Sequence, residues 1–262
     1  MRPLKFHPIL KQTLWGGERI IPYKELASGL SRVGESWELS GMPGSESVVA
    51  EGPWAGSTLS ELIGRFGAEL LGKANYARFG QEFPLLVKFI DAREDLSIQV
   101  HPDDELARKR HGKSGKCEMW YVLEAEPGAS LLTGFSRPIA PAEYERRVAD
   151  NTLTDVLNRQ AIASGDVFYL PAGRVHSIGK GSFIVEIQQS SDITYRIYDF
   201  DRRDAAGNSR ELHTELAREA IDFESSENSR ITYAPENNQE VRLVTTPYFT
   251  TSLYTLTART RC

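Results

Sequence analysis

Residues 165–176 constrain the fold of this chain more than any other stretch of its sequence. They read GDVFYLPAGRVH, an apolar run between a Gly-Asp turn and a Pro-Ala-Gly turn. Proline cannot donate to a β-ladder, so Pro171 predicts the end of a strand, and Gly173 supplies the backbone angles of a tight turn. We therefore expect a second strand that begins at His176, a rigid position for a metal ligand. A lone histidine is more often a surface or hydrogen-bonded residue than a ligand, so the rest of the chain must supply partners.

The composition is that of an ordinary folded protein. Of the 262 residues, 40% are hydrophobic and 26% are charged, which allows one large or two modest domains. The formal net charge is −5 and there is no block rich in Lys or Arg, so we expect neither nucleic acid nor a membrane as a partner. Because there is no signal-like or membrane-spanning run and the only thiols are Cys117 and Cys262, we expect a cytoplasmic protein.

Short strands dominate the predicted secondary structure. Apolar or alternating runs predict strands at 34–40, 46–49, 83–90, 95–100, 117–123, 166–170, 183–188 and 193–198, with three more between 229 and 258. Helices are predicted from a capping box at Thr58 to about Leu71, at 103–110, as two short pieces within 138–160, and at 213–223. This pattern indicates an all-β barrel or sandwich with helical insertions.

Polar residues alternate with apolar ones on several of these strands. Residues two apart on a strand leave the same face, and this relation holds within the sets Gln99/His101, Lys116/Glu118, Glu186/Gln188 and Thr194/Arg196/Tyr198. Half-exposed strands often alternate in this way, so each set alone has an ordinary structural explanation. Together they indicate a barrel with a polar interior patch.

Four residues of this patch have the chemistry of metal ligands. His101, His176 and Glu118 supply two imidazoles and a carboxylate, and Gln99 can add an amide oxygen from the face of His101. This set of N and O donors suits zinc first, with iron or manganese as alternatives. Cys117 leaves the opposite face from Glu118, so we do not expect it to be a ligand.

The other histidines and the acidic run have simpler explanations. We expect surface or capping positions for His7, His111 and His213. The run at 103–105 is expected to begin a helix, where its charges favour the helix dipole and need no further role.

Several longer motifs are recognisable in the chain. Gly165-x5-Pro171-x-Gly173-x2-His176 matches the second cupin motif, and the first cupin motif is altered, with Gln99 in place of a histidine and an insertion before Glu118. Further motifs are WGG (15–17), GESWE (34–38), LSIQVHP (96–102), GKCEM (115–119) and SDITYR (191–196). Together they resemble the motifs of the type I mannose-6-phosphate isomerases (phosphomannose isomerases) of the cupin superfamily, in their short bacterial form.

The resemblance implies a fold, a reaction and a set of roles. The fold would be mainly β, a cupin-type β-barrel (jelly roll) with helical insertions, and the reaction an interconversion of mannose 6-phosphate and fructose 6-phosphate through a cis-enediol. It implies one zinc ion per chain and a small phosphorylated hexose as the partner of a monomer or weak homodimer. The implied zinc ligands are Gln99, His101, Glu118 and His176; the implied catalytic residues are Arg196, Glu186 and Lys116; the implied substrate- or phosphate-binding residues are Ser97, Lys88 and Asp192. Glu186 is favoured over Lys116 as the base, and Asp192 is expected to orient Arg196.

The end of the chain departs from the family pattern. Family members usually complete a second cupin-like barrel, for which only residues 227–262 remain here. We expect a catalytic cupin domain at 1–226 and an incomplete cupin-like segment at 227–262, which is either truncated or packed against the first barrel. Two other functions stay open: a non-catalytic sugar-phosphate-binding cupin, and an iron cupin oxygenase, against which Gln99 argues.

Overall fold

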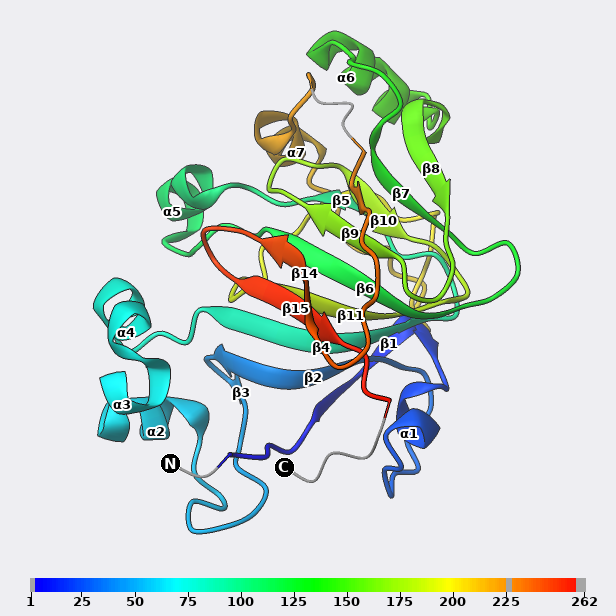
Figure 1. The fold of residues 1–262 in the computed structure, drawn as a ribbon. Coiled ribbons are helices and arrows are strands. Elements are labelled where there is room, and N and C mark those ends of the chain that lie inside the picture. Colours follow the sequence, from blue (N-terminus) through cyan, green and yellow to red (C-terminus); the bar gives the residue numbers. More distant parts are fainter. Residues whose placement is uncertain (1–2, 225–227, 258–262) are drawn as a thin grey trace.

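Two antiparallel sheets face each other across an apolar core (Figure 1) in the computed structural model, which describes residues 3–224 and 228–257. The larger sheet contains, in spatial order, β13 (Arg230–Ile231), β9 (Val167–Leu170), β6 (Glu118–Ala125), β11 (Ser182–Gln189), β4 (Leu85–Ala92), β1 (Ile9–Gly17), β2 (Val33–Met42) and β3 (Ser45–Glu46). The smaller sheet contains β12 (Tyr195–Tyr198), β5 (Ile98–Val100), β10 (His176–Ile178), β7 (Ser130–Phe135) and β8 (Leu157–Ala161). Cys262 and the expected domain boundary at 226/227 lie outside the described residues.

The core between the sheets explains the strand pattern of the sequence. Trp120 and Ile184 reach it from the larger sheet, and Leu131 and Ile178 reach it from the smaller one; all four are buried. Because alternate residues of a strand leave opposite faces, each of these strands also presents a second row of side chains on its other face. The predicted mainly β architecture with helices in the connections is confirmed.

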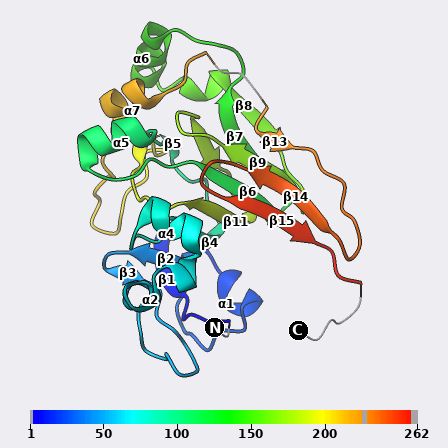
Figure 2. The same ribbon diagram turned by 60° about the vertical axis from the view of Figure 1, so that its left-hand side comes forward.

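The helices lie in the connections between strands (Figure 2): α1 (Ile20–Tyr23), α2 (Leu59–Phe66), α3 (Ala68–Leu71), α4 (Lys73–Phe79), α5 (Asp104–His111), α6 (Pro141–Ala149), the 3-10 helix η1 (Leu153–Val156) and α7 (Thr214–Ala220). The predicted capping box is present, since the Thr58 hydroxyl accepts from the Glu61 N–H at 3.1 Å and the Glu61 carboxylate accepts from the Thr58 N–H at 2.9 Å. The helical stretch is interrupted at Gly67, whose φ of +48° is unfavourable for other residues, and α3 continues it to the predicted end at Leu71.

The prediction of two short helices within 138–160, broken near residues 151–152, agrees with α6 and η1 and is wrong in its last part. Residues 157–161 form β8, which pairs with β7 through Ser130↔Ala161 and Leu131↔Gln160. Leu157 is buried in the core beneath it. Pairing with a neighbouring strand decided this conformation over the local helical pattern, as tertiary context often does.

The last two strands, β14 (Glu240–Thr245) and β15 (Thr250–Tyr254), form a hairpin that lies over β6 (Figure 1). Leu243 and Phe249 of this hairpin pack in one cluster with Cys117 and Met119, on the outer side of the larger sheet. The three strands predicted between 229 and 258 are therefore present: β13 pairs with β9 at the edge of the larger sheet, and the β14–β15 hairpin packs against that sheet. The assignment of this segment to a second cupin-like domain stays a prediction.

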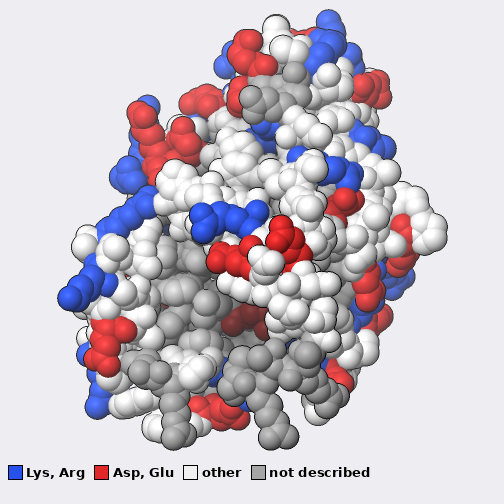
Figure 3. All heavy atoms as spheres, in the orientation of Figure 1, with Lys and Arg blue, Asp and Glu red and all other residues white. Residues whose placement is uncertain are grey.

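The surface is of mixed charge where Figure 3 shows it. On that face, Lys and Arg side chains lie among Asp and Glu side chains rather than in one basic field. No helix within the described residues is long and apolar enough to span a membrane.

Candidate metal centre and active site

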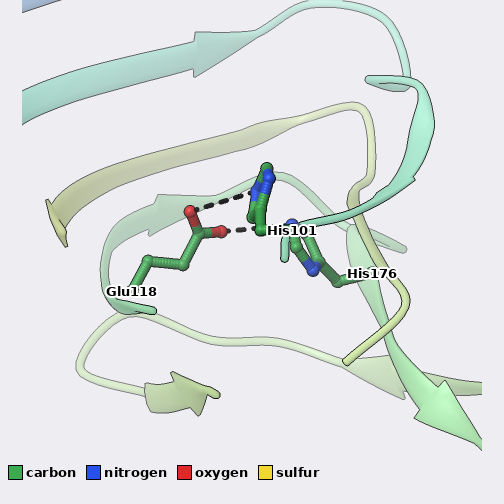
Figure 4. Close-up of side chains that lie close together, drawn as sticks. All are labelled: His101, Glu118 and His176. Carbon is green, nitrogen blue, oxygen red and sulfur yellow. Dashed lines mark ion pairs between the residues drawn. The ribbon is translucent and has the colours of Figure 1, made fainter. Parts of the chain in front are cut away.

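Three side chains from three places in the sequence converge at one point (Figure 4): His101, Glu118 and His176. Glu118 is the first residue of β6 and His176 the first residue of β10, as the turn at Pro171 and Gly173 predicts. His101 directly follows β5, and Gln99 within β5 is the cross-strand partner of His176. Directly opposed residues of neighbouring strands share a face, so the sheet itself places the amide beside the imidazole.

The distances are those of a potential ligand set. The Nε2 atom of His176 lies 3.2 Å from Glu118 Oε1, and the Nε2 atom of His101 lies 3.5 Å from Glu118 Oε2. Gln99 completes the group, with its Nε2 atom 3.3 Å from that of His176. A rotation of the amide by 180° would present Oε1 instead. The three ionisable side chains are at most 2% exposed.

The hydrogen bonds on the far side of each ring fit a cation between them. His101 Nδ1 lies 2.8 Å from the carbonyl oxygen of Ile193, and His176 Nδ1 lies 2.8 Å from that of Arg174. A carbonyl only accepts, so each Nδ1 carries a proton, and in a neutral ring Nε2 then turns a lone pair toward Glu118. Burial, with Lys116 beside the ring, lowers the pKa of His101 to about 3, which keeps it neutral.

The Glu118 carboxylate has the same need for positive charge. Both of its oxygens are buried, and neither accepts a well-directed hydrogen bond within the described residues. Burial alone would raise its pKa, but Lys116, whose Nζ lies 2.9 Å from Oε2, outweighs burial and holds the pKa well below its usual range. The Lys116 ammonium supplies part of that positive charge, since its Nζ also lies 3.2 Å from His101 Nε2. Two imidazole nitrogens and a carboxylate that face one another are in addition a donor set that fits a bound metal ion.

A chain of alternating charges leads from this centre along the sheet. Lys116 Nζ lies 3.9 Å from Glu186 Oε1; Lys88 Nζ lies 2.9 Å from the same oxygen and 3.6 Å from Glu35 Oε1. Burial acts to lower the pKa of Lys88, but Glu186 and Glu35 raise it above its ordinary value. Burial likewise acts to raise the pKa of Glu35, and Lys88 lowers it. The buried carboxylates of Glu118 and Glu186 and the partly buried one of Glu35 face two ammonium groups, a net negative charge that favours a bound cation.

Glu186 is held at both oxygens. The indole N–H of Trp120 donates to Oε2 at 2.8 Å, and Lys88 faces Oε1. Glu186 and Lys88 are cross-strand partners in β11 and β4, which fixes their separation. The fold brings Glu186, Lys116 and Lys88 together beside the metal centre, and their roles stay predictions.

The remaining predicted site residues lie around this group. Arg196 is the cross-strand partner of Gln99; its Nη1 donates to the Glu211 carbonyl at 2.9 Å, and its buried Nε has no hydrogen-bond partner within the described residues. Ser97 is buried, with Oγ 3.3 Å from Gln99 Oε1. Asp192 forms a half-exposed ion pair with Lys113 at 2.9 Å, so its expected role of orienting Arg196 stays a prediction.

Glu35 is the member of this group that sequence reasoning missed. The signal was present, because Glu35 and Trp37 alternate on one strand, and the Trp37 indole N–H donates to the Glu35 carboxylate at 2.6 Å. Trp37 is also the cross-strand partner of Lys88. What the sequence does not contain is the pairing of β2 with β4, which brings this carboxylate beside the lysine.

The two-sheet fold with a buried His, Glu, His centre defines a protein of the cupin class with a site that could bind a metal ion. Residues 4–134 match the family model of the phosphomannose isomerase type I catalytic domain. The mannose-6-phosphate isomerase ManA of Bacillus subtilis is 39% identical over 224 residues, which are 85% of this chain and 69% of that protein. The mannose-6-phosphate isomerase of Streptococcus mutans is 37% identical over 251 residues, 95% of this chain and 77% of that protein.

Solved structures agree with these matches. The crystal structure of the Bacillus subtilis mannose 6-phosphate isomerase superimposes with a TM-score of 0.87 at 33% identity, covering 95% of this chain and 79% of that one. A putative mannosephosphate isomerase from Archaeoglobus fulgidus, at 23% identity and a TM-score of 0.72, shares the fold. The chain belongs to the type I phosphomannose isomerase family, and it is an enzyme of the isomerase class.

Proposed function

We propose that this enzyme interconverts D-mannose 6-phosphate and D-fructose 6-phosphate through a cis-enediol and depends on zinc. The observation that carries the proposal is the buried centre of His101, Glu118 and His176, joined through Lys116 to Glu186. It agrees with the activity named for the relatives from Bacillus subtilis and Streptococcus mutans.

Gln99, His101, Glu118 and His176 would hold the zinc ion. Two imidazole nitrogens, a carboxylate and an amide oxygen form a donor set that zinc accepts readily. The carbonyls of Ile193 and Arg174 fix the two rings with Nε2 toward the centre. When bound, the metal supplies positive charge that polarises oxygens of the sugar.

The proton transfer between C1 and C2 would fall to Glu186, with Lys116 as its partner. Trp120 and Lys88 hold the Glu186 carboxylate in one orientation. For a general base, correct position relative to the proton comes before a favourable pKa. Lys116 lies between this carboxylate and Glu118, where it can donate to an oxygen that becomes negative in the enediol stage.

Arg196 would stabilise that negative charge or hold the phosphate. Among the residues that the structure describes, its buried Nε–H has no hydrogen-bond partner, and burial followed by the nearby charge of Arg210 lowers its pKa. An incompletely compensated guanidinium favours an anion, and its fork of donors matches a phosphate. Ser97 and Lys88 are the further phosphate-binding residues that we propose, although Lys88 is also paired with Glu186.

The experiment is a turnover assay joined to metal analysis. Mannose 6-phosphate isomerisation should disappear on chelation, return with zinc, and be absent in His176→Ala. Isotope exchange at C2 in the same samples separates catalysis from binding. Tight binding of the sugar phosphate without exchange would support a binding module instead, and oxygen uptake with iron would support the oxygenase.

We also propose that the enzyme is cytoplasmic and a monomer or weak homodimer. Light scattering at several protein concentrations tests the oligomeric state, and fractionation of the source cells tests the location.

A further inference from the structure

The strand that supplies Glu118 is preceded by a segment that the C-terminal hairpin holds in place. Residues 115–117 lead directly into β6 and carry Lys116 at their centre. Two of their N–H groups donate to side chains: Gly115 N–H to Asp104 Oδ1 at 2.8 Å, and Cys117 N–H to Gln189 Oε1 at 2.8 Å. The third, that of Lys116, donates to the carbonyl of Pro102 at 3.1 Å.

Asp104 joins these contacts into one network. Its Oδ1 atom also accepts from Gln189 Nε2 at 3.1 Å, so the residue that holds Gly115 and the residue that holds Cys117 are bonded to each other. Its Oδ2 atom accepts from the Tyr248 hydroxyl at 2.8 Å. Burial acts to raise the pKa of Asp104, but these hydrogen bonds outweigh it and lower the pKa, so the acceptor is ionised.

Tyr248 comes from the turn of the β14–β15 hairpin, far away in sequence. The turn is rigid, since Thr246 Oγ1 accepts from the N–H groups of Tyr248 and Phe249, each at 3.0 Å. Arg78 of α4 lies over the Tyr248 ring at 5.5 Å and donates to the Pro247 carbonyl. These contacts hold the hairpin turn in place, so the Tyr248 hydroxyl meets Asp104 in a defined position.

Residues 115–117 pass so close to the start of α5 that position 115 has no room for a side chain. A Cβ atom on Gly115 would lie 2.4 Å from the carbonyl carbon of Asp103 and 2.5 Å from the Asp104 nitrogen. Only glycine allows this backbone contact, and the contact places the Gly115 N–H against the Asp104 carboxylate. A small shift of Asp104 would thus move the backbone that presents Lys116 and Glu118.

We propose that Tyr248, Asp104 and Gln189 are positioning residues for the metal centre, through which the C-terminal hairpin fixes the backbone that carries Lys116 and Glu118. The inference deepens the proposed function and rests on it for the metal. The hairpin then supports the active site through Asp104, in addition to the apolar packing beneath it.

The test compares zinc affinity, measured by competition with a chromophoric chelator, across five proteins: the wild type, Tyr248→Phe, Asp104→Ala, Asp104→Asn and Tyr233→Phe. Asp104→Ala should weaken zinc binding roughly tenfold, the lower end of the effect of groups that orient metal ligands. Tyr248→Phe should weaken it about fivefold, the equivalent of one hydrogen bond. Asp104→Asn keeps an acceptor for Gly115 and Gln189 and offers its amide to the Tyr248 oxygen, so its affinity should stay near that of the wild type.

Tyr233→Phe is the matched control. The Tyr233 hydroxyl donates to the Gly165 carbonyl at 2.6 Å, and its ring packs against the same apolar cluster as Tyr248, but it does not contact Asp104. It should lower the melting temperature and leave zinc affinity unchanged. Equal zinc affinity in Tyr248→Phe and Tyr233→Phe would overturn the proposal, as would an Asp104→Asn protein as weak as Asp104→Ala. Zinc affinity is independent of the sugar, so a failure of mannose 6-phosphate turnover in the wild type sinks the proposed function and leaves this comparison readable.

Discussion

Cys117 and Glu118 are neighbours in sequence, both are buried, and both can ionise, yet their surroundings are opposite. Cys117 lies on the outer side of the larger sheet, in the apolar cluster beneath the hairpin. Glu118 lies on the inner side with His101, His176 and Lys116. Burial raises the pKa of the Cys117 thiol to about 12, whereas Lys116 outweighs burial at Glu118 and lowers the pKa of that carboxyl.

The difference shows that burial alone does not make a reactive group. Desolvation disfavours the charged form of both residues, and only a charged partner reverses its effect. The outer face at the start of β6 therefore stabilises the protein by apolar packing. The inner face holds ionised side chains that can bind a metal ion or take part in a reaction. Substitutions on the two faces should separate metal binding from folding stability.

The largest effect is expected from the inner face. Glu118→Ala removes the carboxylate that faces both imidazoles and leaves Lys116 without its nearest partner. Zinc affinity and activity should fall by more than about a hundredfold, since even groups that only orient ligands can cost that much. Metal analysis after dialysis measures the zinc that each variant retains, and Glu124→Ala, at an exposed position of the same strand, is the control. A Glu118→Ala protein that retains zinc would refute the ligand assignment.

Next comes the charge chain behind the centre. Lys88→Met leaves the buried carboxylate of Glu186 and the partly buried one of Glu35 without the cation that they share. The free energy of unfolding should fall by about 3–5 kcal/mol, as when one partner of a buried ion pair is removed. Chemical denaturation tests this prediction.

Lys24→Met is the matched comparison for Lys88→Met, because Lys24 pairs with Glu38 in a more exposed position. Its expected cost is at most about 1 kcal/mol. Equal losses of unfolding free energy in Lys88→Met and Lys24→Met would show that the chain of alternating charges contributes no more to stability than an ordinary ion pair.

The outer face should show the reverse pattern. Met119→Ala opens a cavity in the cluster beneath the hairpin, where Met119 is fully buried. Unfolding free energy should fall by about 2–5 kcal/mol, while zinc affinity changes far less than in Glu118→Ala. Calorimetry and chelator competition on the same sample decide this, and a loss of zinc as large as that in Glu118→Ala would erase the distinction between the two faces.

Much of this arrangement could be predicted because alternation is a local property. The spacing of Gln99 and His101, and the turn that ends at His176, predict which side chains share a face whatever the order of the strands in the sheet. The inner and outer positions of Glu118 and Cys117 follow from the same rule, and the structure has both as predicted.

The parts that could not be predicted depend on which strands become neighbours. Glu35 joins the charge chain only because β2 pairs with β4, and residues 157–161 form a strand only because β7 lies beside them. Asp104 was expected merely to begin a helix; α5 does begin there. Its further contact with Tyr248 spans 144 positions of the sequence, a separation that no local pattern encodes.

The smallest effect is expected from an ion pair at the surface. There water solvates each charged group, so removing one partner costs less than it does on the buried inner face. Arg137, which precedes α6, and Arg147 on α6 donate to the Glu143 carboxylate and lower its pKa to about 2. A lowered pKa in the folded state means that the carboxylate contributes stability above its ordinary pKa and loses it as the pH falls toward 2. The stability difference between the wild type and Glu143→Gln should therefore be small at pH 6 and shrink further by pH 3, in denaturation curves at both values. A difference as large as that for Lys88→Met, or one that grows on acidification, would mean that burial is not what separates the two kinds of ion pair.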